Sequence, residues 1–296
     1  MVDLSIIIIS YNTCELTVKC IESIFKYTKG VNFEVIVVDN ASTDKSVLTI
    51  ARKFKSRVTL IKNKENVGFG VANNQGMSVA EGRYICLLNS DTLLIGNIFE
   101  KVLDWFDHKA LLEIGSSVGM VGVKLLNPDR SEQESYGGYP TLARVFGRVM
   151  LGHFIQVGLS DNLKKVDYVK GACMILKREV FETVGGFDPN VFMYVEEVEW
   201  CYRVKQAGYT IVYWPYGAII HFGGASSPSG NRVIFSHIFN GYRYFYKKHY
   251  SRWQLLILEL ILKAKAHAMV LFGILFSKPH FVDTYRSVLQ GMKRSL

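Results

Sequence analysis

The chain has 296 residues, is 49% hydrophobic and carries a formal net charge of +9. This length and hydrophobic content suit one large α/β domain or two small ones, and they exclude an intrinsically disordered chain. The positive charge belongs to the end of the sequence, because residues 241–296 hold ten Lys and Arg against two acids, while residues 1–240 are nearly neutral.

The cysteines and the first residues bear on the cellular compartment. Five cysteines are widely spaced and match neither a zinc pattern nor a disulfide framework, which is typical of a reducing cytosol. The residues before the first apolar run include Asp3 and no Lys or Arg, so we predict no export signal. We therefore expect a cytoplasmic protein.

The first half of the chain alternates short apolar runs with amphipathic stretches. Strands are predicted at 4–9, 34–38, 58–61, 84–88 and 118–126. The helices between them carry apolar residues at 16–25, 47–54 and 98–106, and a polar helix follows residues 66–70 and runs through Met77. Asn12 and Glu15 resemble a capping box at the start of the first helix. Strands that alternate with helices at this spacing predict a mostly parallel sheet with right-handed crossovers.

The second half is less regular at its start. Residues 127–167 are rich in Gly, Ser and polar side chains, and we expect loops there that vary with the substrate. A strand at 168–176, a helix at 178–184, a turn at 185–189, a helix that opens within 193–203, and strands at 209–214 and 218–222 follow. Gly208 is expected to end the second of these helices, and Glu199 and Arg203 to form a structural ion pair on it.

Acidic or polar side chains follow four of the apolar runs. They lie at Asp39–Asp44, Asn89–Asp91, Glu196–Glu199 and His221. Such clusters converge on a ligand at the carboxyl edge of an open α/β sheet. Each alone also fits a plainer interpretation: an Asx turn, acids in the first turn of a helix, or a core histidine. Neither a Gly-x-Gly-x-x-Gly fingerprint after the first strand nor a Walker lysine loop occurs, which counts against dinucleotide oxidoreductases and P-loop enzymes.

Taken together, five segments resemble those of the inverting glycosyltransferases of family 2. They read SIIIISYN at 5–12, VVDNASTD at 37–44, NVGFG at 66–70, LLNSDT at 87–92, and GGFD at 185–188 with EEVE at 196–199. Within that family the chain is most similar to bacterial rhamnosyltransferases. The resemblance implies a GT-A fold, that is, a Rossmann-like, mostly parallel sheet with flanking helices. It divides the chain into a catalytic domain at 1–240, with a nucleotide-binding half at 1–125 and an acceptor-binding half at 126–240, and a helical tail at 241–296.

The same resemblance implies roles for individual residues in donor binding. The nucleotide site would comprise Ser10, Tyr11, Asn12, Asp39, Ala41, Asn66, Gly68, Asn89 and Ser90, with Asp39 accepting the imide N–H of uracil or thymine. Asp91, the last acid of the family's Asp-x-Asp motif, and His221 would bind Mg²⁺ or Mn²⁺ on the diphosphate. Asn89 stands where that motif has its first acid.

For catalysis, the resemblance places the base at Glu197, with Glu196 as its rival. A base is required because the acceptor hydroxyl loses a proton while a nucleoside diphosphate leaves from the opposite face of the sugar. Gly171, Gly186, Phe187 and Asp188 would line the sugar and acceptor pocket. Gly185 caps the preceding helix in either interpretation, and residues 225–230 form either a lid or an ordinary surface loop.

The tail at 241–296 mixes aromatic and basic side chains before a strongly apolar stretch at 255–276. Charges interrupt this stretch, so no charge-free segment reaches the roughly 18 residues that cross a bilayer. We expect an interfacial helix pair on an anionic cytoplasmic leaflet; a helical cap or a homodimer interface is the alternative. Nucleic-acid binding is disfavoured, because the charge is mixed with long aliphatic runs.

The sequence therefore predicts a metal-dependent inverting sugar transferase, peripheral on the inner face of the cell membrane. Its donor would be a dTDP- or UDP-sugar, most specifically dTDP-L-rhamnose, and its acceptor a lipid-linked or cell-envelope glycan. Two alternatives remain open. One is a sugar nucleotidyltransferase, which would release pyrophosphate, and the other a non-catalytic partner that keeps the fold and recruits other glycan enzymes.

Overall fold

A computed structural model describes residues 1–151, 159–224 and 230–294. The chain folds into two compact units. Unit 1 comprises Met1–Gly138, Val157–Pro189 and Glu197–Ser226, and unit 2 comprises Tyr139–Gln156, Asn190–Glu196 and Ser227–Leu296. The predicted division into nucleotide-binding and acceptor-binding halves stays a prediction.

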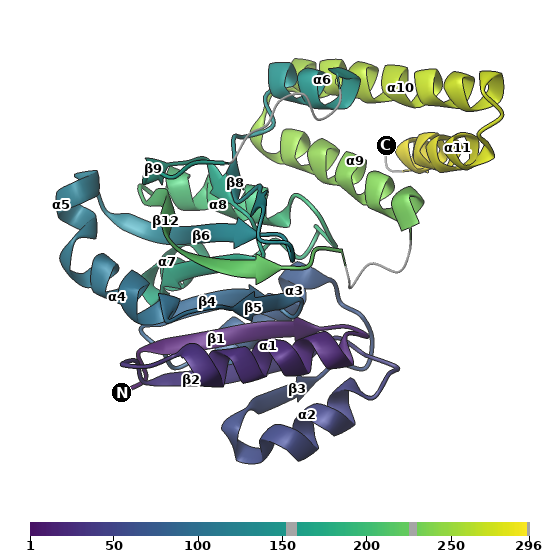
Figure 1. Ribbon diagram of the computed structural model, residues 1–296. Helices are drawn as coiled ribbons and strands as arrows, with labels where there is room; N and C mark the ends of the chain where they lie inside the picture. The colour runs from purple at the N-terminus through teal and green to yellow at the C-terminus, as the bar shows by residue number, and fades with distance from the viewer. Residues whose placement is uncertain (152–158, 225–229, 295–296) are drawn as a thin grey trace. The chain divides into compact units, whose positions relative to one another are not determined.

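Unit 1 is built on a mixed sheet whose strand order is β3-β2-β1-β4-β11-β6-β12-β5 (Figure 1). The strands are β1 (Leu4–Ser10), β2 (Phe33–Asp39), β3 (Thr59–Lys62), β4 (Tyr84–Asn89), β5 (Thr92–Leu94), β6 (Val118–Leu126), β11 (Cys173–Lys177) and β12 (Thr210–His221). Strands β1 to β4 are parallel to one another, as is β12 to β6. Strand β11 is antiparallel to both of its neighbours, and β5 is antiparallel to β12.

Helices cover both faces of this sheet, which explains why every residue of β1 is buried. One face packs on α1 (Cys14–Tyr27), α2 (Ser46–Phe54), α4 (Ile98–His108) and α5 (Ala110–Ile114), whose apolar residues join one core with alternate residues of the strands. The other face packs on α3 (Phe69–Val79), α7 (Arg178–Val184) and α8 (Glu196–Gln206). Gly76 of α3 contacts Ile7 so closely that a Cβ there would collide with it.

The register of the central strands brings the candidate site residues to one edge. Ser10 of β1 pairs with Asp39 of β2, and Ile9 pairs with Asn89 of β4. Asp39 and Asn89 therefore flank the carboxyl end of β1, roughly 10 Å apart, which is twice the spacing between strands. This is the edge at which open α/β sheets bind ligands.

Several elements of unit 1 differ from the sequence-based prediction. The predicted strand at 168–176 is two strands, because the chain passes from a small sheet formed by β8 (Tyr136–Gly137) and β10 (Tyr168–Val169) into β11. The predicted strands at 209–214 and 218–222 are one strand, β12, with an irregular register between Trp214 and Ala218. Two short strands, β7 (Glu132–Gln133) and β9 (Lys164–Lys165), extend the large sheet.

The helix ends give a mixed result. The predicted capping box was wrong: the N-cap of α1 is Thr13, without a side-chain cap, because Asn12 is left-handed and bonds to Thr43 instead. Gly185 does cap α7, with φ of +76°. The ion pair between Glu199 and Arg203 is confirmed, at 3.0 Å.

Unit 2 contains the helices α6 (Leu142–Leu151), α9 (Gly230–His249), α10 (Arg252–Leu275) and α11 (Pro279–Arg294). Helix α6 lies in the segment predicted as loops. The tail at 241–296, where a helix pair was predicted, contains α10 and α11 together with the last residues of α9. Helix α10 contacts the other three. Among the described residues, no helix combines the length and the apolar character that crossing a membrane requires.

Candidate active site

Asp39 is the last residue of β2 and is only 2% exposed. Its Oδ1 accepts a hydrogen bond of 3.0 Å from the backbone N–H of Ser42. Its Oδ2 is buried and, among the residues that the structure describes, has no hydrogen-bond partner. A buried acceptor without a donor costs roughly 1–3 kcal/mol, so this oxygen suits a donor on a ligand.

The loops after β1 and β2 are fastened to each other beside Asp39. Asn12 Oδ1 accepts from the backbone N–H of Thr43 at 2.7 Å, and the backbone N–H of Asn12 donates to Ser42 Oγ at 2.9 Å. Asp44 Oδ2 accepts from the backbone N–H of Cys14. Partial desolvation would raise the pKa of Asp44, but hydrogen bonds from Ser46 and Cys14 outweigh it and lower the pKa. Ala41 is left-handed, with φ of +67°, which turns the chain away from the strand end.

A network of amides, centred on Asn40, holds the loop before α3. Asn40 Nδ2 donates to Asn66 Oδ1 at 2.8 Å, and Asn40 Oδ1 accepts from the backbone N–H of Val67 at 3.1 Å and from Asn63 Nδ2 at 3.0 Å. Asn66 Oδ1 also accepts from the backbone N–H of Gly68, whose φ of +85° precedes the first turn of α3. The predicted residues Asn66 and Gly68 are thus linked to the strand end that carries Asp39 through Asn40, a residue of the 37–44 segment for which no role was predicted.

Four hydroxyl residues link the central elements. Ser90 Oγ lies 3.1 Å from Thr13 Oγ1, and Ser10 Oγ lies 3.2 Å from Thr17 Oγ1 of α1. Ser10 and Ser90 are both buried, so their side chains serve the packing between β1, α1 and the β4–β5 turn. Tyr11, by contrast, is half-buried at the edge of the sheet.

Asp91 and His221 meet although 130 positions separate them in the chain. Asp91 lies in the turn between β4 and β5, and His221 is the last residue of β12, where it pairs with Thr92. His221 Nε2 lies 3.4 Å from Asp91 Oδ1 and 3.4 Å from Asn89 Nδ2. The backbone N–H of Phe222 donates to the Asp91 carbonyl, which fixes the end of β12 to the turn.

These two side chains fit a divalent cation that is shared with a substrate. Among the described residues, no group of three or more His, Cys, Asp and Glu side chains could hold a metal ion. Mg²⁺ usually needs only one or two protein carboxylates, because substrate phosphates and water complete its shell. Two neighbouring ligands of such an ion lie about 3 Å apart, close to the separation between His221 Nε2 and Asp91 Oδ1. The donor set therefore suits a cation that arrives with a diphosphate.

The predicted sugar and acceptor residues gather around α3. Asn74 of α3 binds both sides of the Phe187 peptide: Asn74 Oδ1 accepts from the Phe187 N–H and Asn74 Nδ2 donates to the Phe187 carbonyl, each at 2.8 Å. A Cβ on Gly186 would collide with this amide, so only glycine fits there. A Cβ on Gly171 would lie 4.0 Å from Glu197 Cβ and 3.5 Å from the Phe69 ring.

Glu196 and Glu197 open helix α8. Glu196 is 7% exposed and Glu197 is half-buried. The two residues before them, Tyr194 and Val195, are left-handed with φ of +65° and +72°. This conformation is unfavourable for a β-branched residue and is often found at functional sites. Asp188 is half-buried in the turn after α7. Of the segment predicted as a lid or a surface loop, residues 225–229 lie outside the described residues.

Comparison with known proteins identifies the family. The family described as "Glycosyl transferase family 2" matches residues 5–185. The chain belongs to this family. A low-salt glycan biosynthesis hexosyltransferase, Agl10, of Haloferax volcanii is 30% identical over 71% of this chain and 64% of its own length. An N-acetylglucosaminyl-diphospho-decaprenol L-rhamnosyltransferase of Mycobacterium tuberculosis is 29% identical over 63% of this chain and 66% of its own length.

Solved structures show the same fold at low sequence identity. GalNAc-T7 with UDP, GalNAc and Mn²⁺ superposes with a TM-score of 0.59 at 14% identity, covering 83% of this chain and 50% of that one. The mannosyltransferase PcManGT of Pyrobaculum calidifontis, in complex with GDP-Man and Mn²⁺, gives 0.55 at 15% identity over 98% of this chain and 86% of that one. The predicted GT-A-like α/β fold is therefore confirmed. An uncharacterized protein of Sinorhizobium fredii is 30% identical over 70% of this chain but is matched over only 23% of its own length. The chain therefore spans less than two thirds of the length of this relative and of the Haloferax volcanii and Mycobacterium tuberculosis relatives.

Proposed function

We propose that this chain transfers a sugar, with inversion, from a pyrimidine nucleotide sugar to a hydroxyl of an acceptor glycan. The observation that carries the proposal is the meeting of Asp91 and His221, within 3.4 Å, at the sheet edge that also holds Asp39. A carboxylate and an imidazole suit the cation on a diphosphate, while a buried carboxylate oxygen without a partner suits a base N–H. Membership of family 2 favours a sugar transferase over a nucleotidyltransferase.

The proposed donor is dTDP-L-rhamnose and the proposed acceptor a lipid-linked or cell-envelope glycan. The Mycobacterium tuberculosis relative is named as a rhamnosyltransferase that acts on a diphospho-decaprenol-linked sugar, and the Haloferax volcanii relative as a hexosyltransferase of glycan biosynthesis. Uracil and thymine both present an imide N–H to Asp39, so this contact accepts dTDP- and UDP-sugars alike. The choice of rhamnose as the sugar is supported by the name of the Mycobacterium tuberculosis relative.

In the proposed mechanism, the chain's side chains hold the donor and move one proton. Asp39 Oδ2 accepts the imide N–H, and Tyr11 lines the base. Glu197 takes the proton of the acceptor hydroxyl as the acceptor oxygen bonds to the anomeric carbon, with Glu196 as the rival for this role. The bond from that carbon to the diphosphate breaks, and the nucleoside diphosphate leaves with the electron pair.

Asp91 and His221 would hold Mg²⁺ or Mn²⁺ on the departing diphosphate. When bound there, the cation offsets the negative charge that develops on the leaving group. Asn89, which replaces an acid of the family motif, directs an amide N–H at His221 Nε2 and adds no charge to the site. Gly171, Gly186, Phe187 and Asp188 would line the sugar and acceptor side, next to Glu197.

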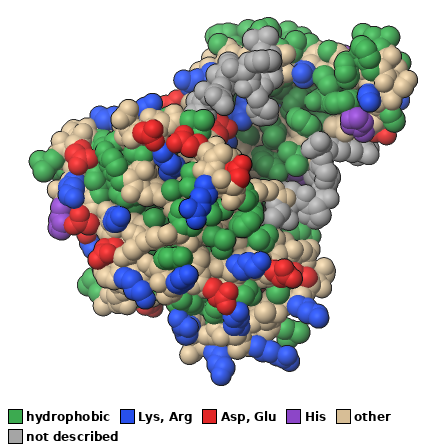
Figure 2. Space-filling view, in the orientation of Figure 1, with side chains coloured by type: hydrophobic (Ala, Val, Ile, Leu, Met, Phe, Trp, Pro, Cys, Tyr) green, Lys and Arg blue, Asp and Glu red, His purple; other side chains and the backbone are tan. Residues whose placement is uncertain are grey.

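We also propose that helix α10 places the enzyme on the inner face of the cell membrane. Exposed apolar side chains recur along one side of α10: Trp253, Leu256, Ile257, Leu260, Leu271, Ile274 and Leu275. Figure 2 shows hydrophobic surface over α10 and α11, with Lys and Arg side chains among it. An apolar helix face with basic neighbours suits the headgroup region of an anionic membrane. A homodimer through the same face is the alternative.

The experiment that tests the proposal measures nucleoside diphosphate release from dTDP-rhamnose, UDP-sugars and GDP-sugars, with and without Mn²⁺, in the presence of membrane lipid extract. We expect release from a pyrimidine donor that depends on the metal. Asp91→Ala and Glu197→Gln should each reduce turnover at least about 100-fold while circular dichroism stays unchanged. Pyrophosphate release would instead identify a nucleotidyltransferase, and absence of both nucleotide binding and turnover would identify a non-catalytic partner.

A further inference from the structure

His221 makes a second contact, on the side of the ring that faces away from Asp91. Its Nδ1 lies 2.6 Å from Gln133 Oε1. Gln133 belongs to β7, in a segment that the sequence analysis assigned to substrate-dependent loops. The imidazole is therefore held between Gln133 on one side and the Asp91–Asn89 turn on the other.

The orientation of the Gln133 amide is fixed by two acceptors. Gln133 Nε2 donates to Asn127 Oδ1 at 3.0 Å and to the carbonyl of His221 at 3.3 Å. Asn127 is itself oriented, because its Nδ2 donates to Ser131 Oγ at 2.9 Å. The amide oxygen of Gln133 must therefore face Nδ1, and since an amide oxygen only accepts, Nδ1 carries the hydrogen. Asn89 Nδ2 points a donor at Nε2, which agrees with a lone pair on that nitrogen.

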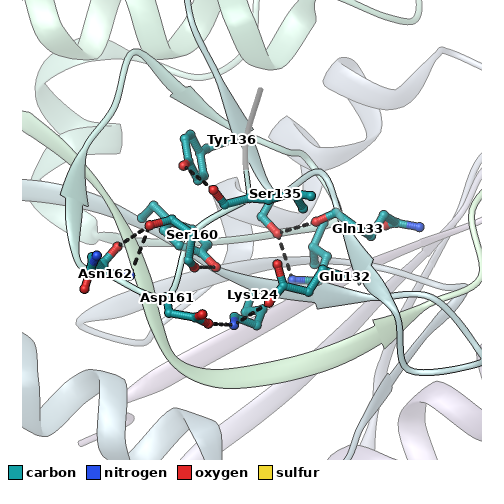
Figure 3. Close-up of polar contacts among 11 residues, drawn as sticks. Lys124, Glu132, Gln133, Ser135, Tyr136, Ser160, Asp161 and Asn162 are labelled. Atoms are coloured by element: carbon teal, nitrogen blue, oxygen red, sulfur yellow. Dashed lines mark hydrogen bonds and ion pairs between the residues drawn. The ribbon is translucent and has the colours of Figure 1, made fainter. Parts of the chain in front are cut away.

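The hairpin that carries Gln133 is clamped at several points (Figure 3). Gln133 pairs with Leu125 of β6, and its carbonyl accepts from Ser135 Oγ at 2.9 Å. Ser135 is 2% exposed, and its Oγ accepts in turn from the backbone N–H of Leu125. The position of the Gln133 side chain is thus set by backbone pairing and by a buried hydroxyl.

Glu132, the residue before Gln133, anchors the same hairpin through Lys124. Lys124 Nζ binds Glu132 Oε1 at 2.9 Å and also pairs with Asp161, and Figure 3 shows these two acids on either side of the ammonium group. The hydrogen bond from Lys124 to Asp161 raises the pKa of Lys124, so the lysine stays charged across the physiological range. A histidine that binds a metal through one ring nitrogen is oriented by a hydrogen bond at the other, and the partner in that bond must itself be held in place. The contacts of Glu132 and Lys124 hold the hairpin that carries Gln133.

We infer that Gln133 is a positioning residue, which holds His221 as the Nδ1–H tautomer and leaves Nε2 beside Asp91 to bind a cation. The role of that cation rests on the proposed function, whereas the tautomer rests on the contacts of His221 alone. The hairpin at 127–135, predicted to vary with the substrate, would then support the residues that bind the diphosphate cation. Outer partners of this kind typically contribute about 10-fold to 100-fold in metal affinity.

The test uses Gln133→Met, which removes the acceptor that faces Nδ1 while keeping a side chain of similar size. Long-range ¹H–¹⁵N spectra of histidine-labelled protein, with the His221 signals assigned from His221→Gln, report the tautomer without any ligand. We expect the Nδ1–H form in the wild type and a shift to the Nε2–H form in Gln133→Met. Gln206→Met, on the exposed end of α8, is the matched control. An unchanged tautomer in Gln133→Met would overturn the inference.

A second measurement tests the consequence for the cation. Calorimetry with Mn²⁺ and dTDP should show affinity for Mn²⁺ about tenfold weaker in Gln133→Met, with Gln206→Met close to the wild type. Equal Mn²⁺ affinity in Gln133→Met would refute the role in metal binding. A wild type that binds no Mn²⁺ with any nucleotide, yet shows the tautomer shift on substitution, would contradict the proposed function and leave the positioning of His221 intact.

Discussion

At Asp39 we expect ligand binding to come at the expense of the stability of the free protein. Its Oδ1 is paired with the Ser42 backbone, but its buried Oδ2 has no partner among the described residues. Desolvating a carboxylate oxygen without returning a hydrogen bond destabilises the folded state. A donor from a nucleotide base would remove this cost, so stability and binding should respond in opposite directions to a change at Asp39.

We predict that Asp39→Asn weakens binding of UDP and dTDP about 10-fold to 100-fold while the melting temperature of the free protein stays equal or rises. The amide oxygen can keep the bond from the Ser42 N–H, which leaves the NH₂ group to face the base N–H as a second donor, at a cost of about 1–3 kcal/mol. Isothermal calorimetry measures the binding and scanning calorimetry the melting temperature. Asp104→Asn, an exposed residue of α4, is the control. Unchanged affinity in Asp39→Asn would refute the base contact.

The candidate site was only partly predictable at the level of residues. Asp39, Asp91 and His221 could be selected because each lies at or shortly after the end of an apolar run and the family resemblance implies a role for each. The structure brings the last two into contact. No role was predicted for Asn40, although it lies in the 37–44 segment, or for Gln133. Asn40 acts through partners more than 20 positions away, and Gln133 through one 88 positions away. No local pattern of hydrophobicity records such long-range pairing.

At the scale of elements, helices α9 and α10 are joined by a buried ion pair. Arg243 Nη2 lies 2.9 Å from Glu259 Oε1, both side chains are 9% exposed, and Lys263 binds the other oxygen of Glu259. Burial would raise the pKa of Glu259, but the hydrogen bonds from Arg243 and Lys263 outweigh it and lower the pKa below its usual value. A carboxyl group with a lowered pKa stabilises the fold above its unfolded pKa, and the stabilisation is lost as the pH falls through the folded pKa.

We predict that Glu259→Gln lowers the free energy of unfolding by about 2–4 kcal/mol at pH 7, because it removes the negative partner of two cations. The difference from the wild type should shrink as the pH falls below about 4, where Glu259 itself becomes protonated. Urea unfolding followed by circular dichroism across this pH range measures both effects. Glu179→Gln, whose pair with Lys177 is exposed, should change stability little at any pH. A Glu259→Gln deficit that stays constant down to pH 3 would contradict the assignment.

Helices and strands were predicted correctly where a local sequence pattern marks them, and missed where they depend on distant contacts. Strand β6 and helix α7 match the predicted bounds, because a continuous apolar run and a helical repeat ending at Gly185 are both local signals. Helix α6 was missed inside a polar segment, although its own apolar face packs on α10 within unit 2. The antiparallel insertion of β11 between β4 and β6 could not be predicted either, because strand order depends on contacts between distant segments.

At the scale of the whole molecule, the distribution of charge and exposed apolar surface is uneven. The last 56 residues hold nearly all of the net positive charge, and the outward side of α10 carries Trp253, Leu256 and Leu260, the last of them 67% exposed. The buried side of the same helix includes Leu258, Leu262 and Ala266, so α10 is apolar on both sides. A helix that is apolar on its exposed side needs a further partner, and the nearby Lys and Arg favour an anionic membrane.

We predict that the protein sediments with vesicles of phosphatidylglycerol, that high salt weakens this binding, and that vesicles of phosphatidylcholine bind it poorly. The double variant Leu256→Glu/Leu260→Glu should weaken vesicle binding at least about tenfold, because two exposed leucines that would insert into the membrane are replaced by charges that the anionic surface repels. Leu111→Glu/Leu112→Glu, which changes two exposed leucines of α5, is the matched control and should bind like the wild type. Light scattering measures whether the wild type and the Leu256→Glu/Leu260→Glu variant are monomers or dimers. A wild-type dimer that the Leu256→Glu/Leu260→Glu change converts to a monomer, with vesicle binding unaltered, would show that this face joins two copies of the chain and would refute the membrane assignment.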